Sequence, residues 1–280
     1  MASYAGVVLA GGRSSRMGTP KAALEWHGST LLRRTVGIIS RATGGPVVVV
    51  RAPGQALPEL PSYIEVVDDP CEGKGPVQGL AVGLAAIADR AEIAFVSSTD
   101  LPFLHPAFVR RVIRAAQDGA DIGLPVAHGF PQPLAASYRT TLAQAAARLV
   151  AQDRLRPAFL FEDHVVARLD EAALRGDPVL AALDPGLDSV VNINDPAEYE
   201  AARAQPAPQV TVQRFGTLAN DHRGPQPVHA ATAACAAAAV GLALDGHVVS
   251  ALNGDQITRD GQTPLATGDT VFFLSADAGG

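Results

Sequence analysis

Residues 5–21 read AGVVLAGGRSSRMGTPK, an apolar run that passes directly into a loop rich in glycine and arginine. The β-branched and apolar residues at the start predict a buried strand. The glycines that follow leave backbone N–H groups free to face an anion. Arg13, Arg16 and Lys21 add cations that can form charge-assisted hydrogen bonds to phosphate groups. The segment therefore predicts a strand followed by a triphosphate-binding loop.

Two better-known phosphate loops do not fit this segment. The spacings GxxxxGK[ST] and GxGxxG are both absent from it, which argues against a P-loop kinase and against a dinucleotide-binding dehydrogenase. An ordinary strand-to-helix loop with solvated arginines would account for the glycines alone. The cluster of three cations favours the anion site over that simpler explanation.

Further β-branched runs alternate with helical segments along the first two thirds of the chain. This alternation predicts a three-layer α/β domain, Rossmann-like and with a mostly parallel sheet, over residues 1–203. Ser29 is expected to cap a helix that runs to about Arg41. The expected strands cover residues 6–9, 47–50, 64–67, 93–97 and 122–126, and further helices are expected at 76–88, 106–117, 139–151 and 196–203.

A proline-rich segment, AQPAPQ at residues 204–209, predicts a linker to a second domain. Residues 210–280 then show a different order of elements, with strands expected at 210–215, 248–252 and 270–274 and a helix at about 230–240. A unit of this kind, small and of α+β class, is long enough to fold alone but only marginally stable by size.

Composition excludes several classes of protein. Apolar residues make up 48% of the 280 residues, as in ordinary soluble domains, and the formal charge of −6 argues against a nucleic-acid-binding surface. Cys71 and Cys235 lie too far apart for a zinc motif, and they do not form a disulfide framework. No export signal is evident at the N-terminus, and the apolar run at residues 230–244 is too short to span a bilayer. We therefore expect a cytoplasmic protein without membrane segments.

An acidic residue, Asp100, follows the apolar run IAFVSS at residues 93–98. Ligands of open α/β sheets bind at the carboxyl ends of the strands, and a carboxylate there can hold Mg²⁺ against phosphate oxygens. Asp100 could instead cap the helix expected to begin at Pro106, and for this residue alone the two roles are equally well supported. The neighbouring cation loop favours the metal role.

Residues 9–21, LAGGRSSRMGTPK, match the pattern LAGGxSxRMGxxK and resemble the signature loop of the molybdenum cofactor nucleotidyltransferases. This resemblance implies Mg²⁺-dependent transfer of GMP from GTP to molybdopterin, whose phosphate attacks the α-phosphorus of the nucleotide. It also implies roles for single residues. The nucleotide is bound by Leu9, Ala10, Gly11, Gly12, Arg13 and Lys21, while Arg16, Lys21 and Asp100 are catalytic and Asp100 holds the metal.

Two later segments resemble further parts of the same site. Residues 68–80, DDPCEGKGPVQGL, contain a GPxxG element, and the resemblance assigns nucleotide contacts there, although a turn explains most of the composition. It also implies late loop residues near the pterin. One of them, Asn194, is at least as well explained by local turn hydrogen bonds. The residues concerned are Asp68, Gly75, Pro76 and Gly79 on the nucleotide side, and Gln132, Pro133, Asn192 and Asn194 on the pterin side.

The choice of base remains open between two branches of this family. The motif LAGG and the GPxxG element resemble guanylyltransferases, whereas Pro20 before Lys21 resembles cytidylyltransferases. Residues 50–53, VRAP, stand where the family has an asparagine. We favour GTP, with CTP transfer, a sugar-phosphate nucleotidyltransferase or a non-catalytic carrier protein as alternatives.

Residues 210–280 resemble a ubiquitin-like sulfur carrier of the molybdopterin synthase small subunit or thiamine-sulfur type, with ALNGD at 251–255 and LATGDTV at 265–271. The resemblance implies a β-grasp fold whose terminal Gly279 and Gly280 enter a partner's active site and become a thiocarboxylate. Composition alone favours a frayed end instead. The partners implied are a molybdopterin synthase large subunit and an adenylating activating enzyme.

Overall fold

The computed structural model describes residues 3–11, 20–70, 73–219, 224–245, 247–254 and 256–275. These residues fall into two compact units. The first consists of Met1–Leu24 and Leu31–Pro196, and the second of Glu25–Thr30 and Ala197–Gly280. The segment expected to be a linker, residues 204–209, follows α7 (Pro196–Arg203) and runs into the start of β11 (Gln209–Arg214).

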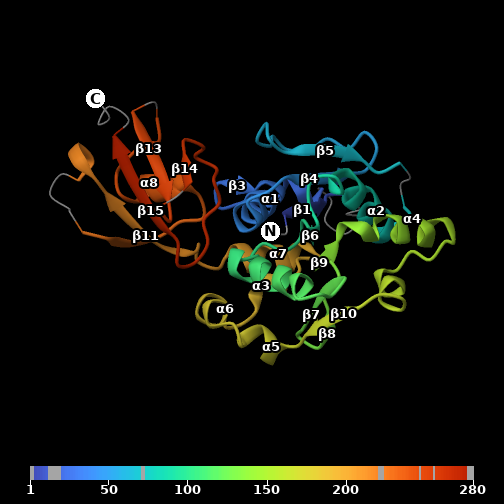
Figure 1. Cartoon of the computed structure of the whole chain (residues 1–280). Helices are drawn as coiled ribbons and strands as arrows, with labels where there is room; N and C mark the ends of the chain where they lie inside the picture. Colours follow the sequence, from blue (N-terminus) through green and yellow to red (C-terminus); the bar gives the residue numbers. More distant parts are fainter. Residues whose placement is uncertain are drawn as a thin grey trace. The chain divides into compact units, whose positions relative to one another are not determined.

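A single large sheet forms the middle layer of the first unit, and its strands follow the order β10-β7-β9-β6-β1-β4-β5 (Figure 1). On one side of this sheet four neighbouring strands are parallel, namely β1 (Tyr4–Leu9), β4 (Val47–Arg51), β5 (Glu65–Asp68) and β6 (Ile93–Ser98). The other side is mixed and comprises β7 (Ile122–Ala127), β8 (Phe130–Pro131), β9 (Ala135–Arg139) and β10 (Val166–Leu169). The expectation of an α/β domain with a mostly parallel sheet is confirmed.

Helices cover both faces of this sheet (Figure 1). The pairs that pack together are α1 (Leu31–Thr43) with α3 (Pro106–Gln117), and α2 (Gly75–Ile87) with α4 (Ala143–Ala151). Two glycines allow the close approach of helix and strand. An ideal Cβ on Gly6 would lie 2.3 Å from Ile39 Cγ2 of α1, and one on Gly83 of α2 would lie 2.3 Å from Val7 Cγ1. Shorter helices, α5 (Glu171–Arg175) and α6 (Pro178–Leu183), complete the unit.

Two local details differ from the expectations above. Strand β9 (Ala135–Arg139) was not anticipated; it directly follows the late loop residues Gln132 and Pro133, takes the first residue of the helix expected at 139–151, and pairs antiparallel with β6. Its buried alanines and Ser137 carry little β-branched signal, so tertiary packing decided the outcome. Ser29 does not cap α1. It lies in β3 (Ser29–Thr30), which pairs with β2 (Glu25–Trp26) in a hairpin that belongs to the second unit.

The second unit contains a separate sheet of five strands in the order β12-β11-β15-β13-β14. Strand β11 is parallel to β15, and the other pairs are antiparallel. Thr232 caps α8 (Ala233–Ala239), whose buried alanines pack against Val210 and Phe273 of the sheet. The expected helix and strands are present, whereas β12 and β14 were not anticipated. The remaining bounds are β12 (Gln226–His229), β13 (Val248–Leu252), β14 (Gln256–Thr258) and β15 (Thr270–Ser275).

Candidate nucleotide site at the carboxyl edge of the sheet

The first parallel strand delivers the glycine-rich loop to the carboxyl edge of the sheet. Beyond β1, the N–H groups of Ala10 and Gly11 both donate to the carbonyl of Val50, at 2.8 and 3.3 Å. An ideal Cβ on Gly11 would lie 3.3 Å from the backbone nitrogen of Ala52, so the close approach of the two chains favours glycine here. The expected nucleotide contacts Gly12 and Arg13 and the expected catalytic Arg16 lie outside the described residues.

Lys21 and Asp100 meet at this edge, although 79 residues separate them in the chain. Lys21 Nζ lies 3.0 Å from Asp100 Oδ2, and the two side chains are only 19% and 18% exposed. Ser98, the last residue of β6, donates its hydroxyl to the other carboxylate oxygen of Asp100. The structure thus pairs the cation of the first loop with the carboxylate that follows β6.

The alternative role for Asp100, a cap of the next helix, is wrong. The cap of α3 is His105, whose ring nitrogen Nδ1 accepts a hydrogen bond of 3.1 Å from the Ala107 N–H. Asp100 lies five residues before that cap and makes its contacts with Lys21 and Ser98 instead. Its carboxylate therefore pairs with Lys21 at the edge of the sheet and has no part in capping α3.

The expected pterin-side asparagines lie beside Asp100. The N–H of the buried Ile193 donates to the Asp100 carbonyl at 3.0 Å. Asn192 and Asn194 flank Ile193 in sequence and are both exposed. This hydrogen bond brings the expected late element, from almost one hundred residues further along the chain, to the metal candidate.

Gln132 and Pro133 occupy the turn before β9. The Gln132 amide donates to the carbonyls of Ala127 and Phe130, each at 3.3 Å. Pro133 accepts a bond of 2.8 Å from the hydroxyl of Tyr138, whose pKa is raised by complete burial. The Leu134 carbonyl accepts a hydrogen bond of 3.1 Å from the Ser98 N–H, which fixes this turn beside the candidate site.

The second glycine-rich loop places its residues at the same edge. Asp68 ends β5, and its carboxylate Oδ1 lies 2.7 Å from Arg51 Nε at the end of β4. Gly75 adopts a positive φ of 69° where α2 begins, and Pro76 occupies the first turn. Gly79 has a packing role, because an ideal Cβ there would lie 3.1 Å from Leu9 Cδ2.

Sequence reasoning missed Gln55 and Arg51. Gln55 connects the segment after β1 to the segment after β4. Its amide nitrogen donates to the Ala10 carbonyl and its amide oxygen accepts from the Ala52 N–H, both at 3.0 Å. Arg51 stands where the resemblance leads one to expect asparagine, and it pairs with Asp68. A glutamine in an irregular segment has no sequence signal. Arg51 and Asp68 did carry a sequence signal, because they are opposite charges at the ends of two consecutive expected strands.

The donor set around Asp100 fits Mg²⁺ only if phosphate oxygens and water complete the shell. Among the described residues no group of three or more His, Cys, Asp or Glu side chains converges as a metal cage. Mg²⁺ in nucleotide enzymes is typically bound by one or two carboxylates together with substrate phosphates. Asp100 is a single hard oxygen donor, which is compatible with this mode. The exposed Asn192 and Asn194 flank Ile193, whose N–H is bonded to the Asp100 carbonyl.

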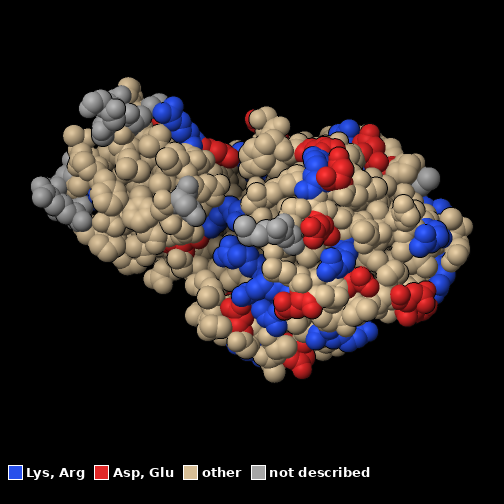
Figure 2. Space-filling model, in the orientation of Figure 1, with Lys and Arg blue, Asp and Glu red and all other residues tan. Residues whose placement is uncertain are grey.

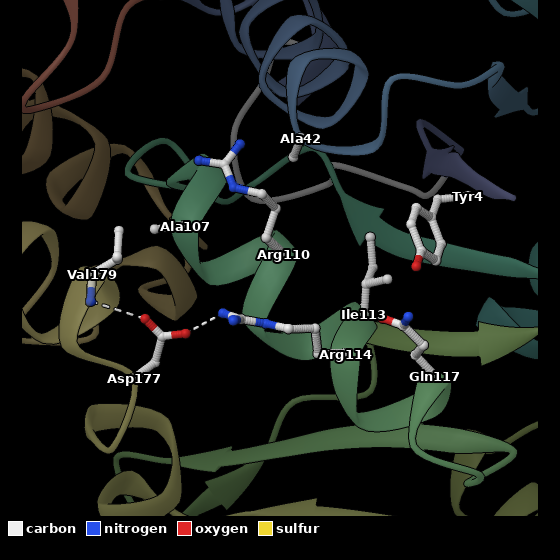
Figure 3. Close-up of a pocket in the computed structure, with 9 residues that line it drawn as sticks. All are labelled: Tyr4, Ala42, Ala107, Arg110, Ile113, Arg114, Gln117, Asp177 and Val179. Carbon is white, nitrogen blue, oxygen red and sulfur yellow. Dashed lines mark hydrogen bonds and ion pairs between the residues drawn. The ribbon is translucent and has the colours of Figure 1, made fainter. Parts of the chain in front are cut away.

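A cavity of 370 Å³ lies away from this edge (Figure 3). It opens near Tyr4, the first residue of β1, whereas the candidate site follows the last residue of that strand. Arg110 and Arg114 extend from α3 along its wall, and Asp177 points toward Arg114 (Figure 3). The cavity is therefore separate from the candidate site.

Asp177 has two structural roles beside this cavity. It pairs with Arg114, and it caps α6 by accepting from the N–H groups of Val179 and Leu180 at 2.9 and 3.0 Å. Burial opposes its ionisation, but the hydrogen bond from Leu180 and the Arg114 guanidinium outweigh that effect and lower the pKa of Asp177. The ionised form therefore stabilises the folded state.

We expect Asp177→Ala to lower the free energy of unfolding by about 1–3 kcal/mol at pH 7, because it removes a cap and a charge partner together. Since the folded-state pKa is lowered, the contribution is present above the unfolded value of about 3.9 and is lost as pH falls through the folded value. Urea unfolding of both proteins from pH 7 to pH 3 measures this. Asp170→Ala, which removes only a cap from α5, is the matched control. Equal losses for the two variants would contradict a role for Arg114.

The visible surface does not form one basic face. In Figure 2, Lys and Arg side chains are bordered by Asp and Glu side chains. This distribution matches the net charge of −6. None of the described helices combines the length and the apolarity that crossing a membrane requires.

Comparison with known proteins places the first unit in a family. Residues 6–168 match the model of the MobA-like NTP transferase domain. A probable molybdenum cofactor guanylyltransferase of Mycobacterium avium is 40% identical over 151 residues, which are 52% of this chain and 75% of that protein. The protein of the same name from Mycobacterium tuberculosis H37Rv is 43% identical over 150 residues, 52% of this chain and 73% of its own length.

Solved structures agree on the fold. Molybdopterin-guanine dinucleotide biosynthesis protein A from Archaeoglobus fulgidus superposes with a TM-score of 0.56 at 22% identity, over 71% of this chain and 96% of that one. The protein Rv0371c from Mycobacterium tuberculosis gives a TM-score of 0.53 at 22% identity, over 72% and 99%. The sequence motif, the edge geometry and the family match converge, and the chain belongs to the MobA-like NTP transferase family.

Proposed function

We propose that the first unit transfers GMP from GTP to the phosphate of molybdopterin, as a molybdenum cofactor guanylyltransferase. The single observation that carries this proposal is the pairing of Lys21 with Asp100, 3.0 Å apart, at the carboxyl edge next to the loop that follows β1. The relatives from Mycobacterium avium and Mycobacterium tuberculosis are named probable molybdenum cofactor guanylyltransferases, which supports the same activity. The family match spans residues 6–168, which include both Lys21 and Asp100.

In the proposed reaction, a phosphate oxygen of molybdopterin forms a bond to the α-phosphorus of GTP. The bond between that phosphorus and the bridging oxygen breaks, and pyrophosphate leaves. No protein nucleophile is needed, so catalysis depends on positioning and on stabilising the charge that develops on the leaving group. The Lys21 ammonium supplies part of that stabilisation, and the resemblance assigns similar roles to Arg13 and Arg16.

Asp100 is the residue that would hold Mg²⁺. When bound, the ion would neutralise phosphate charge during in-line displacement. The chain's own contribution is the orientation of that carboxylate, which Ser98 fixes through Oδ1 and Lys21 through Oδ2. The Ile193 N–H donates to the backbone carbonyl of Asp100 and so fixes the main chain of that residue.

The guanine is expected to lie toward the second glycine-rich loop. Asp68 could accept hydrogen bonds from base or sugar donors, and the exposed Gly75 begins α2 in the same glycine-rich segment. Arg51 holds the Asp68 carboxylate in a fixed orientation, at 2.7 Å. Arg51 belongs to the segment in which the resemblance leads one to expect an asparagine.

Base selection is tested by pyrophosphate release with molybdopterin and either GTP or CTP, each with Mg²⁺. We expect turnover with GTP at least tenfold faster than with CTP, since groups built to bond one base are left unpaired by the other. Faster turnover with CTP would assign the cytidylyl branch that Pro20 suggests. Turnover with a sugar 1-phosphate in place of molybdopterin, or no turnover with any acceptor, would overturn the proposal.

We further propose that residues 210–280 form a β-grasp sulfur carrier. The strand order β12-β11-β15-β13-β14 supports this. The strands that come first and last along the chain, β11 and β15, are parallel neighbours inside the sheet, and α8 lies between β12 and β13 in the chain. The resemblance of ALNGD and LATGDTV to carrier motifs supports it as well. Gly279 and Gly280, which follow β15, lie outside the described residues.

The carrier proposal predicts a thiocarboxylate at Gly280. Intact-mass measurement after incubation with ATP, an adenylating activating enzyme and a sulfur donor should show a gain of about 16 Da, from the exchange of one oxygen for sulfur. Deletion of Gly280 is the control and should abolish the gain. An unchanged mass for the full chain would favour a frayed terminus over a carrier, and with it the partnership with a molybdopterin synthase large subunit would fail.

A further inference from the structure

The hairpin Glu25–Thr30 is held by the C-terminal part of the chain. It lies between Lys21 and α1 in sequence, yet its contacts place it in the second unit. Helix α7, helix α8 and the loop before β15 all contribute polar bonds to it. These are Arg203 Nε to Glu25 Oε2 at 2.6 Å, the Tyr199 hydroxyl to the Glu25 carbonyl at 2.7 Å, Cys235 Sγ to the His27 carbonyl at 3.6 Å, and the Ser29 hydroxyl to Gln262 Oε1 at 3.3 Å.

Glu25 is the central residue of these contacts. Its second carboxylate oxygen, Oε1, accepts from the Gly28 N–H at 2.7 Å and so closes the turn of the hairpin. Gly28 has a φ of 89°, and an ideal Cβ there would lie 3.2 Å from Cys235 Sγ. Burial opposes ionisation of Glu25, but the hydrogen bonds from Gly28 and Arg203 outweigh it and lower its pKa. One carboxylate therefore shapes the turn and binds α7.

The hairpin is joined to Lys21 by a short chain of backbone hydrogen bonds. Lys21 begins the short 3-10 helix Lys21–Ala23, whose end is fixed by the bond from the Leu24 N–H to the Lys21 carbonyl, at 3.1 Å. The Leu24 carbonyl then accepts from the Leu31 N–H at 3.0 Å, which closes the base of the hairpin. A displacement of the hairpin thus passes to the backbone of Lys21 through one residue, Leu24.

We propose that Glu25, bound to Arg203, is a positioning residue that keeps Lys21 in register with Asp100. The inference rests on the proposed role of Lys21 in nucleotidyl transfer. The Glu25 and Arg203 side chains are 47% and 45% exposed, so their pairing alone adds little to global stability. Its value lies in geometry, because small misplacements of a catalytic group lower the rate steeply. The C-terminal part of the chain then serves the transfer reaction as well as any carrier role.

The test uses the full chain and compares Glu25→Gln with Glu65→Gln. Glu65 forms a similar ion pair with Arg90, 2.7 Å long, with side chains 44% and 40% exposed, and it lies in β5 of the first unit. We expect Glu25→Gln to speed amide hydrogen exchange of Ala23 and Leu24 at least about fivefold while the amides of β1 and β4 keep their rates. Glu65→Gln should leave all of these rates unchanged. Equal exchange at Ala23 and Leu24 in the two variants would overturn the inference.

A kinetic comparison separates positioning from a merely structural role. We expect Glu25→Gln to lower kcat of pyrophosphate release about tenfold, with KM for GTP changed less than threefold and the melting temperature unchanged. Arg203→Met should reproduce this loss, and Arg203→Lys, which keeps one donor, should restore most of it. Loss of kcat in parallel with loss of melting temperature, or no rescue by lysine, would contradict positioning.

Hydrogen exchange and kinetics together separate a failure of the positioning role from a failure of the proposed function. An active wild-type enzyme with unchanged exchange and kcat in Glu25→Gln would reject the positioning role and leave guanylyl transfer standing. A wild-type protein without transfer activity would reject the proposed function. In that case the exchange rates of Ala23 and Leu24 alone decide whether Glu25 orders the segment that carries Lys21.

Discussion

Replacing Lys21 by methionine should lower kcat/KM for nucleotidyl transfer by about 10²–10³-fold while the protein stays folded. Methionine keeps an unbranched apolar stem and removes the ammonium that lies 3.0 Å from Asp100. Removing one preorganised group that stabilises transition-state charge typically costs a factor of this size. The loss should appear mainly in kcat, because the charge on the leaving pyrophosphate grows only as the bond breaks. Pyrophosphate release at saturating GTP measures it.

Arg90→Met is the matched control for this variant. Arg90 also loses an ion pair, its 2.7 Å contact with Glu65, but it lies on the surface outside the candidate site. Its kcat/KM should stay within about twofold of wild type, as expected for an exposed pair. Activity of Lys21→Met within threefold of wild type would remove Lys21 from the catalytic group.

The central part of the site was predictable from sequence because its residues follow strands. Lys21 and Asp100 each come after a continuous apolar run, and the carboxyl ends of neighbouring parallel strands must meet at one edge. Neither residue's partner could be read from local spacing. The sheet order, with β1 next to β6, is what brings the two side chains together.

The parts that sequence reasoning missed depend on long-range packing. Ser29 was expected to cap α1, but the hairpin around it bonds to Arg203 and Gln262, residues far along the chain. Strand β9 lacks a β-branched pattern and is defined by its pairing with β6 and β7. Gln55 lies in an irregular segment, and its bonds to Ala10 and Ala52 exist only because β1 and β4 are neighbours.

The C-terminal unit shows the same division between local and long-range information. Its helix and its three most apolar strands were predictable, because each has a clear local pattern. Strands β12 and β14 are short, lie at the two edges of the sheet and contain exposed residues, which is why their sequences carry little signal. The strand order of the sheet, which underlies the β-grasp proposal, follows from pairing that no local pattern encodes.

Asp100→Asn should lower kcat/KM by about 10²–10³-fold and raise the Mg²⁺ concentration for half-maximal activity at least about tenfold. Asparagine keeps the size of the side chain and can still bond with Ser98, so the fold should not change. It removes the charge that would hold the cation against phosphate oxygens and leaves the Lys21 ammonium without its carboxylate. Activity measured against Mg²⁺ concentration, at fixed GTP and molybdopterin, gives both numbers.

Asp89→Asn is the control, since Asp89 is 83% exposed and its contact with Arg90 spans 3.7 Å. An unchanged Mg²⁺ requirement in Asp100→Asn would exclude Asp100 as the metal ligand. The double variant Lys21→Met/Asp100→Asn tests whether the pair acts as one group. Residues that act as a unit lose activity non-additively, so the double variant should lose far less than the product of the two single losses. Fully multiplicative losses would instead mean that Lys21 and Asp100 act independently, and that their contact is not maintained during the reaction.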